Sequence, residues 1–533
     1  MQHKKSFYSP LLVTLILISG IFIGYILNQN GSNSFAFSPL DKQSKINEVL
    51  KIIQNDYVDT INEQELVEAS LNEILHNLDP HSIYIPAKNF QNIEDEMLGN
   101  FDGIGVQYRI IDDSIVVIMP INGGPSAKKG IRAGDRIVGV EGDDITKEKM
   151  TNARVMKLLK GPKGSTVLLT IFRPSINDKL EFEIKRAKIP VYSIDIAYMV
   201  NSSVGYIKIN RFSATTYDEF ISKTDELKAR GMQKLIVDLR DNGGGYLRAA
   251  TNLCNDFLED TTTIVFTIGK NREKEVIRAD KDTRLKNIDL QILINEYSAS
   301  ASEIVAGAIQ DNDRGLIIGR RSFGKGLVQE QLAFSDKSAI RLTVARYYTP
   351  SGRCIQKSYQ KGYKDYEADL MNRYSNDELI NPDSIHFNDS LKYYTTAGKL
   401  VYGGGGIMPD IFVPIDTSSQ YSYFNKIAGR GLIYKYSFDF IDGKRDHYIQ
   451  KYRSAENFIE KFNVSDRMLS SIIKLADENG IEYNSNSYLY SKSSIKTRLK
   501  AFIGRGLFDN EAFYPILLSE DKTFLKAVNE FEK

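Results

Sequence analysis

The sequence has no tryptophan, and its 533 residues include only two cysteines and five histidines. Two cysteines cannot make a disulfide framework, and Cys254 and Cys354 lack the spacing of metal ligands. Their separation along the chain leaves open whether they pair with each other. The composition therefore excludes a small disulfide-stabilised scaffold and gives no sign of a metal site.

The chain also has almost no net charge, +1 at pH 7. Without an overall positive or negative field, the composition gives no reason to expect nucleic acid or an acidic partner. The length is sufficient for three or four domains with a substantial core. Function therefore has to be sought in local segments.

The longest apolar run lies at the N-terminus. Lys4 and Lys5 precede residues 11–28, and no further charged residue occurs before Asp41. About 20 apolar residues span a bilayer, and lysines before such a run favour a cytoplasmic start. We expect a cytoplasmic segment at 1–10 and a transmembrane signal-anchor at 11–28. A cleaved signal peptide is the alternative, although no clear cleavage site follows. Either reading places the remainder outside the cytoplasm.

The rest of the chain divides into four regions. Residues 41–95 place apolar side chains at three- and four-residue intervals, which is typical of helices. Residues 96–187 contain short β-rich runs with glycine turns. Strands and helices alternate over 188–415, apart from a polar excursion at 351–400, and predict an α/β core with a largely parallel sheet. Residues 416–533 are expected to be helical, with no recognisable chemistry.

Three loops that follow buried strands of the α/β region carry polar residues. They are Asp238–Tyr246 (DLRDNGGGY), Asn295–Asp311 (NEYSASASEIVAGAIQD) and Gly319–Glu330 (GRRSFGKGLVQE). Functional groups in open α/β sheets gather beyond the carboxyl ends of the strands, so we expect these loops to converge. Taken singly, each is also compatible with a tight turn, a helix cap or a solvated lysine.

The third loop is similar to a phosphate-binding loop. Gly319, Gly324 and Lys325 give G-x-x-x-x-G-K, but the Ser or Thr that should follow is replaced by Gly326. A nucleotide-dependent enzyme would also lack ATP outside the cytoplasm. The sequence therefore favours another role for Lys325.

Together, these loops and their neighbours resemble the carboxyl-terminal processing (tail-specific) serine protease family. The resemblance rests on LDPHS, FDGIG, DLRDNGGG, SASASE, SFGKGLVQ, TPSGR and GIMPD, in this order, over roughly residues 40–415. It implies that Ser300 is the nucleophile and Lys325 the general base. It further implies that Gln329 orients the lysine and that Asp311 gives structural support.

The resemblance also implies a fold. The expected architecture is a crotonase-like α/β protease core at 188–415, with an inserted PDZ-like domain at 96–187. An N-terminal helical region at 41–95 precedes them. A helical C-terminal extension at 416–533 follows, and the resemblance does not cover it.

A lysine base agrees with the residues available. A serine nucleophile needs a base within hydrogen-bond reach, but none of the histidines lies in the three loops. These are His3, His76, His81, His386 and His447. His81 is expected to cap or pack within the helical region. A lysine acts as a base only when neutral, so its pKa must fall by about 3 units from about 10.4. Burial can produce such a shift.

An oxyanion site is also predicted. Ser300 would open the helix ASEIVAGAIQD, which directs the backbone N–H of Ala301 toward an oxyanion at the positive helix end. The pair Gly244–Gly245 is the candidate second donor because glycine allows close backbone approach, and family analogy favours Gly245. This chemistry requires no metal or cofactor.

The segment FDGIGV at 101–106 is a candidate peptide-binding site. Backbone N–H groups here would bind a terminal carboxylate, and an adjoining edge strand would pair with the peptide. The expected residues are Gly103, Ile104, Gly105 and Val106. An ordinary glycine turn is the alternative. The sequence does not distinguish a domain that delivers substrate from one that gates the active site.

These inferences predict a membrane-anchored, extracytoplasmic (periplasmic) serine endopeptidase. It would bind exposed C-terminal tails and cleave near the C-terminus of protein substrates through a Ser300–Lys325 dyad. A non-catalytic PDZ scaffold at the membrane is the alternative function. Expected partners are protein substrates and, through the N-terminal helix, the membrane, but no nucleic acid. A homo-oligomer or an adaptor protein stays open.

Overall fold

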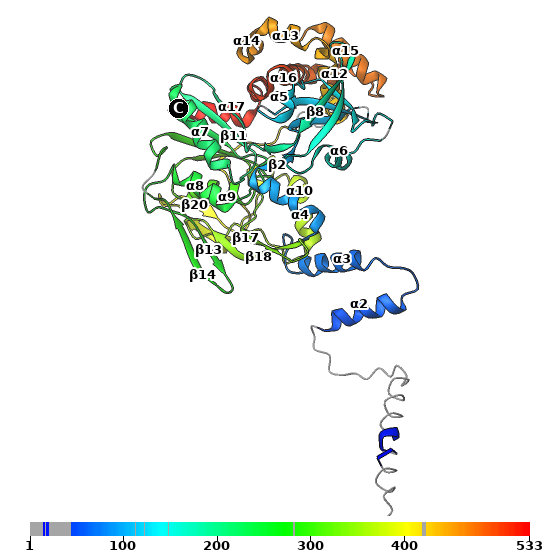
Figure 1. The fold of residues 1–533 in the computed structure, drawn as a ribbon. Helices are drawn as coiled ribbons and strands as arrows, with labels where there is room; N and C mark the ends of the chain where they lie inside the picture. The colour runs from blue at the N-terminus through cyan, green and yellow to red at the C-terminus, as the bar shows by residue number, and fades with distance from the viewer. Residues whose placement is uncertain are drawn as a thin grey trace, which may run out of the picture. The chain divides into compact units, whose positions relative to one another are not determined.

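The computed structural model describes most of the chain (Figure 1). The described residues are 14–15, 17–20, 44–111, 113–121, 123–147, 149–280, 283–417 and 423–533. The predicted cytoplasmic segment at 1–10 and most of the predicted signal-anchor at 11–28 lie outside them. Within the described ranges, no helix is both long and apolar enough to cross a membrane. The chain divides into two compact units, Met1–Leu71 and Asn72–Lys533.

The predicted helical region contains three helices and one short strand. Helix α2 (Ser44–Asp56) lies in the first unit. The boundary between the two units falls within helix α3 (Glu63–His76). The turn LDPHS follows, and there the Asp79 carboxylate accepts hydrogen bonds from the backbone N–H groups of His81 and Ser82. Strand β1 (Ile83–Ile85) and helix α4 (Ala87–Leu98) complete the region.

The inserted β-rich domain is closed by its own ends. Strand β2 (Asn100–Gly103) pairs antiparallel with β9 (Ala187–Pro190), which brings the start and end of the insertion together. Between them lies a sheet of order β3-β4-β5-β7-β8, with β6 on β5. Alternate residues of β7 are buried, because successive side chains of a strand point to opposite faces. The elements are β3 (Val106–Ile111), β4 (Ser114–Pro120), α5 (Pro125–Lys129), β5 (Arg136–Val140), β6 (Asp143–Asp144), α6 (Asn152–Leu159), β7 (Thr166–Arg173) and β8 (Asp178–Lys185).

The α/β core is built on a sheet of order β10-β11-β12-β15-β16-β21. All neighbours are parallel except β10 and β11. Leu235, Ile236 and Val237 of β12 are fully buried, as expected for a strand covered on both faces. The strands are β10 (Ile194–Met199), β11 (Val204–Ile209), β12 (Lys234–Asp238), β15 (Asp289–Ile294), β16 (Leu316–Gly319) and β21 (Ile411–Phe412).

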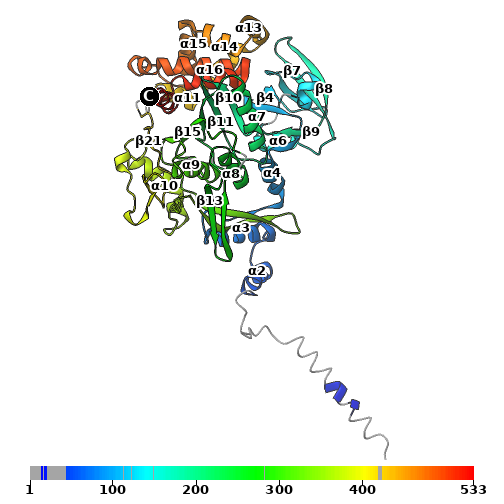
Figure 2. The same cartoon turned by 90° about the vertical axis from the view of Figure 1, so that its left-hand side faces the viewer.

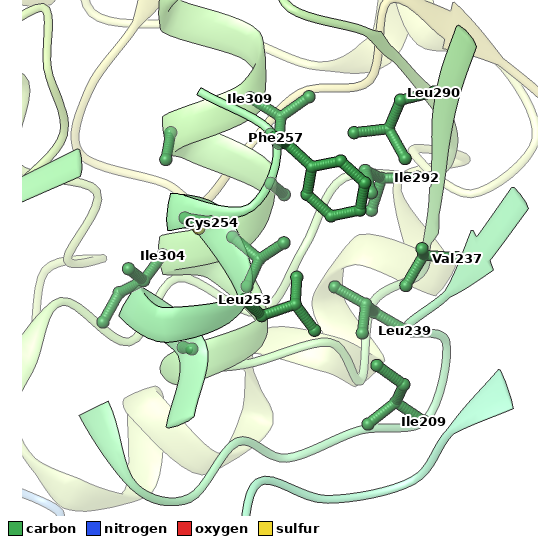
Figure 3. Close-up of a cluster of buried hydrophobic side chains, with 14 of the residues drawn as sticks. Ile209, Val237, Leu239, Leu253, Cys254, Phe257, Leu290, Ile292, Ile304 and Ile309 are labelled. Atoms are coloured by element: carbon green, nitrogen blue, oxygen red, sulfur yellow. The ribbon is translucent and has the colours of Figure 1, made fainter. Parts of the chain in front are cut away.

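Helices α7 (Thr216–Ala229), α8 (Leu247–Asn255) and α9 (Ala301–Asp311) pack on this sheet. Leu253 of α8 and Ile309 of α9 lie in one apolar cluster with strand residues (Figure 3). Every residue of α9 is buried, so this helix forms the centre of the core. Cys254 is buried in the same cluster, and both Cys254 and Cys354 are free thiols.

The strands of the core do not all join the parallel sheet. A second, antiparallel sheet has the order β1-β18-β13-β14, with β17 also on β18. A parallel pair needs a long crossover, whereas β17 and β18 are joined by a short link, so they can only pair as a hairpin. The expectation of one largely parallel sheet was therefore incomplete. The strands are β13 (Thr263–Gly269), β14 (Arg272–Arg278), β17 (Leu327–Ala333) and β18 (Ala339–Tyr348).

The polar excursion carries helix α10 (Tyr363–Ser375), 3₁₀ turns at Pro382–Ser384 and Asp389–Leu391, and the strand pair β19 (Lys392–Tyr394) and β20 (Leu400–Tyr402). The described residues of the predicted extension form helices joined by short loops. Its helices are α11 (Tyr423–Gly429), α12 (Leu432–Ile441), α13 (Arg445–Tyr452), α14 (Ala455–Lys461), α15 (Asp466–Glu478), α16 (Ser485–Leu518) and α17 (Lys522–Glu530). Both views show α13, α14 and α15 gathered along α16 (Figures 1 and 2).

The extension has two packing surfaces. Helices α11 to α16 share an apolar core of their own. Beyond a break in α16 at Phe508 and Asp509, where the backbone is not helical, the chain turns to the protease core. There Phe524 and Ala527 of α17 pack on the face of the parallel sheet opposite α8 and α9. The extension therefore completes the core that positions the site.

Candidate active site

Ser300 lies at the start of α9, where the chain leaves β15. Its backbone has φ 55° and ψ −113°, a strained combination for a residue other than glycine. Neighbouring contacts hold it there. The backbone N–H of Ser300 donates to Glu303 Oε2 at 2.9 Å, and the carbonyl of Asn242 accepts from the flanking Ala299 N–H and Ser302 Oγ. Strain of this kind occurs at sites where a side chain must be presented in a set direction.

Lys325 is held by the residue predicted to orient it. Its Nζ donates to Gln329 Oε1 at 2.9 Å, and Gln329 Nε2 donates to the carbonyl of His81 at 2.6 Å. The second bond fixes the amide so that its oxygen faces the lysine. Burial, assisted by the positive charge of Arg341, lowers the pKa of Lys325 to about 8, although Glu303 and Asp79 oppose the shift. Near neutral pH, a useful fraction of this amine is uncharged.

Ser300, Lys325 and Gln329 line one cavity of about 590 Å³, together with residues 243–247 and Arg341. The three predicted loops therefore converge, as the sequence indicated. Among the described residues, no hydrogen bond joins the Ser300 hydroxyl to the Lys325 amine. Catalytic hydrogen bonds are often long until substrate binds. The relevant observation is therefore that Ser300 and Lys325 line the same cavity.

The glycine loop lies against Ser300. A Cβ on Gly244 would lie 2.8 Å from Ser300 Cβ, and one on Gly245 would lie 2.0 Å from the carbonyl oxygen of Phe212. The N–H of Gly244 already donates to Asn242 Oδ1. The Phe212 N–H donates to the Gly244 carbonyl, and the Tyr246 N–H donates to the Phe212 carbonyl. This bridge between Phe212 and Gly245 directs the Gly245 N–H to the side of the loop away from Phe212. In the described part of the chain, the N–H groups of Gly245 and Ala301 have no hydrogen-bond acceptor.

Two buried residues that the sequence analysis missed join the serine and lysine loops. The carboxylate of Glu303 accepts from the backbone N–H groups of Ser300, Gly324 and Lys325 and from Ser322 Oγ. Burial raises the pKa of Glu303, and these donors oppose the rise. The Tyr347 hydroxyl lies 2.5 Å from the Lys325 carbonyl and 3.2 Å from the Ser300 carbonyl. A Ser-x-x-Glu capping pattern signals Glu303, whereas no local pattern signals Tyr347.

Asp311 lies at the opposite end of α9 from Ser300. Its carboxylate accepts from Arg353 Nη2 at 2.7 Å and from Ser351 Oγ at 2.6 Å. Arg353 is 1% exposed and also donates to the carbonyl of Tyr402. Asp311 thus anchors the TPSGR segment and is not among the residues that line the active-site cavity.

His81 lies closer to the site than its place in the helical region suggested. Its Nε2 is 2.7 Å from the Tyr366 hydroxyl, and its ring contacts Phe323 edge-on. Burial and the charge of Lys325 lower the pKa of His81 to about 4. The ring therefore packs under the lysine loop in its neutral form, in agreement with a packing role. Among the described residues, no group of three or more histidine, cysteine or acidic side chains is arranged to hold a metal ion.

The predicted peptide-binding residues lie at one end of a groove in the inserted domain. A cavity of about 40 Å³ separates Gly103–Val106 from helix α6, where Val155, Met156 and Leu159 face it. Strand β3, which begins at Val106, is an edge of its sheet. Gly105 has φ 76°, and a Cβ there would contact Ile189. An edge strand beside an apolar helix face is suited to an added peptide strand.

Sequence comparisons agree with this organisation. Residues 203–364 match peptidase family S41, and residues 103–185 match the PDZ domain family. Residues 27–89 match the activating protease CtpB N-terminal domain, and residues 423–509 match a family of unknown function.

Curated proteins also match a large part of the chain. The carboxy-terminal-processing protease of Bartonella bacilliformis is 32% identical over 353 residues, covering 64% of this chain and 80% of the relative. The chain belongs to the carboxy-terminal processing protease family. CtpA of Bacillus subtilis is 31% identical, with 68% of this chain and 77% of the relative covered. A solved photosystem II D1 C-terminal processing protease is 24% identical with a TM-score of 0.35, covering 70% of this chain and 94% of that one.

Family membership confirms several predictions. The chain is a serine-type peptidase with a mixed α/β core, a PDZ domain and helical segments at both ends. The prediction of a C-terminal processing protease is confirmed at the level of the family, and the alternative of a non-catalytic PDZ scaffold is not favoured. The roles of individual site residues stay predictions.

Proposed function

We propose that this protease cleaves near the C-terminus of protein substrates through a dyad of Ser300 and Lys325. The observation that carries the proposal is that a half-buried lysine with a lowered pKa, fixed by Gln329, opens into the same cavity as a serine on a strained helix start. A neutral amine in that position can accept the proton of a nearby hydroxyl.

The steps follow from this placement. Ser300 Oγ attacks the carbonyl carbon of the scissile bond while Lys325 takes its proton. The ammonium then gives this proton to the leaving amine as the C–N bond breaks, and an ester on Ser300 is left. Water, deprotonated by Lys325, hydrolyses the ester and restores the hydroxyl. Lys325 is therefore a base in this scheme and not a phosphate ligand.

The oxyanion of each tetrahedral intermediate would be bound by two backbone donors. The N–H of Ala301 lies at the positive end of α9, and the N–H of Gly245 faces away from its pairing with Phe212. Donors placed before the reaction stabilise the developing charge without reorganising. Glu303 and Tyr347 act through the backbone by holding the serine and lysine loops in register.

The PDZ groove supplies a means of binding the substrate tail. A terminal carboxylate would accept from the N–H groups of the segment Gly103–Val106, and the tail would pair with the β3 edge. The apolar residues of α6 favour an apolar last side chain. A protein substrate with an exposed C-terminal tail is the partner that fits this groove.

A membrane-anchored, extracytoplasmic location is proposed on the sequence alone. Lys4 and Lys5 followed by the apolar run at 11–28 favour an N-terminal anchor with the protease outside the cytoplasm. Protease treatment of intact and of opened cells would check this. Digestion of the catalytic unit only after the envelope is opened, but before the inner membrane is broken, agrees with a periplasmic location.

The test of the dyad uses the full chain in a nonionic detergent. It is incubated with an unfolded protein that ends in an apolar C-terminus, beside Ser300→Ala and Lys325→Ala, and the products are identified by mass spectrometry. We expect cleavage near the substrate C-terminus by the wild type and none by either variant, with folding checked by circular dichroism. If Lys325→Ala cleaves as fast as the wild type, the base is another residue and the mechanism is wrong.

A further inference from the structure

A second cavity, outside the active site, lies between the PDZ domain and the C-terminal extension. It has a volume of about 130 Å³, room for about four water molecules at their liquid volume. Arg109 of β3 lines it from the PDZ domain, and Arg445 of α13 and Arg505 of α16 line it from the extension. No aspartate or glutamate lines this cavity.

The charges of these three arginines act on one side chain that also lines the cavity, Tyr434. Arg109 Cζ lies 4.0 Å from the ring centre of Tyr434. Arg109, Arg505 and Arg445 each act to lower the pKa of the Tyr434 hydroxyl, against the effect of its burial. Arg445 also lies between the two domains, because a Cβ on Gly134 or on Gly506 would lie within 4 Å of its guanidinium. The arginines thus converge from three elements on one place.

These charges lack paired carboxylates. Among the described residues, none of the three arginines has an acidic oxygen within 4.0 Å. The nearby acids bond to other arginines: Asp442 accepts from Arg136 at 2.9 Å, and Asp446 lies 3.9 Å from Arg132. Their charges and that of Asp135 still favour the charged form of Arg445, although burial has the larger effect and lowers its pKa. Asp509 feels the charge of Arg505, but it does not line the cavity. Arg445 and Arg505 are half-buried, whereas Arg109 is exposed. Half-buried cations that have no bonded carboxylate are costly, and an anion bound among them reduces that cost.

The chemistry of the lining indicates the class of anion. Guanidinium groups bind tetrahedral oxyanions through paired N–H donors, and arginine is preferred to lysine for this reason. The volume suits a single phosphate group. Phe502 and Ile441 supply apolar walls, which would accept a small organic group attached to it. We infer that this cavity is a binding site for a phosphate group, either free phosphate or the phosphate of a small monoester, which links the PDZ domain to the extension.

The test is isothermal titration calorimetry on the full chain in a nonionic detergent, at fixed ionic strength. Inorganic phosphate, glycerol 3-phosphate and acetate are titrated separately. We expect saturable 1:1 binding of phosphate or of glycerol 3-phosphate, and about tenfold weaker binding, or none, for acetate. Tighter binding of glycerol 3-phosphate identifies a monoester as the ligand, and equal or tighter binding of inorganic phosphate identifies the free ion.

Variants locate the site. Arg445→Gln and Arg505→Gln should each weaken phosphate binding at least tenfold, whereas Arg109→Lys, which keeps the charge but loses the paired donors, should weaken it less. Arg467→Gln, on the exposed face of α15, is the matched control and should bind as the wild type does. Retained peptidase activity and circular dichroism show that each variant is folded, and Arg505→Lys replaces any variant that is not.

Three results would overturn the inference. They are the absence of binding by both phosphate probes, acetate binding as tight as phosphate binding, and equal phosphate affinity in the wild type and all folded cavity variants. None of them bears on the Ser300–Lys325 mechanism, because the cavity does not include those residues.

Discussion

At the scale of single residues, the protonation of Lys325 controls the proposed reaction. Its pKa is about 8, lowered first by burial and then by the charge of Arg341. The base must be uncharged, so kcat/KM should rise with pH and level off above about pH 8. A measurement of kcat/KM from pH 6 to 10 checks this rise. A rate that is independent of pH over this range would contradict a lysine base.

The variant Arg341→Met tests the electrostatic part of that shift. A neighbouring cation disfavours the ammonium form, so its removal should raise the pKa of Lys325 and move the rising limb to higher pH. A rise of up to about one unit would lower kcat/KM at pH 7 by up to about tenfold, with recovery above pH 9. Arg341→Lys keeps the charge and should keep the wild-type profile. If Arg341→Met shifts nothing, burial alone sets the pKa.

Tyr347→Phe tests the link between the two loops. The substitution removes only the hydroxyl that contacts the carbonyls of Lys325 and Ser300. Loss of one buried hydrogen bond should lower the free energy of unfolding by about 1–2 kcal/mol. It should also lower kcat more than it raises KM, because the reacting groups and not the substrate groove are displaced. Tyr348→Phe, at the next position, is the control. Equal effects of the two substitutions would contradict a specific role for Tyr347.

At the scale of elements, the glycine loop after β12 must approach the start of α9 without side chains. Gly244→Ala should reduce kcat/KM at least about 100-fold, because its Cβ would displace Ser300 from the oxyanion donors. Gly243 offers a matched control, since a Cβ there meets nothing within 4 Å. Gly243→Ala should retain near wild-type activity. Steady-state kinetics on both variants decides between a loop fitted to Ser300 and a loop that is only a turn.

The same elements show how far sequence reasoning extends. The order of loops after buried strands predicted their convergence, because parallel strands direct their carboxyl ends to one edge. The pairing of β1 with β18 could not be predicted, since the two segments are distant in sequence and the residue pattern of a strand does not specify which strand it pairs with. For this reason His81, which precedes β1, was expected away from the lysine loop. Tyr347 was missed because a buried tyrosine in a strand is ordinary unless its hydroxyl contacts are known.

At the scale of the whole molecule, the C-terminal extension is part of the protease core. Arg240, two residues beyond the end of β12, donates to both carboxylate oxygens of Asp521, at 2.9 and 2.8 Å. Phe524 of α17 lies edge-on against Tyr206 of β11 and is buried on the face of the parallel sheet opposite α8 and α9. Helix α9, which begins at Ser300, packs on one face of this sheet, and α17 packs on the opposite face. The sheet that positions Ser300 is therefore shielded from water on its second face by α17. No pattern in residues 416–533 signalled this contact, because an amphipathic helix does not specify the surface it covers.

Phe524→Ala should therefore destabilise the peptidase as well as the extension. Truncation of a large buried aromatic residue costs about 3–5 kcal/mol of the free energy of unfolding, and here the loss falls on the sheet that positions Ser300. Leu525, the next residue along α17, is 39% exposed, and Leu525→Ala should cost less than about 1 kcal/mol. The half-life of peptidase activity at elevated temperature, measured for both variants, shows whether the protease core needs the contact with α17. A short half-life for Phe524→Ala alone means that α17 is structural support for catalysis. Equal half-lives would mean that the core is stable without this contact.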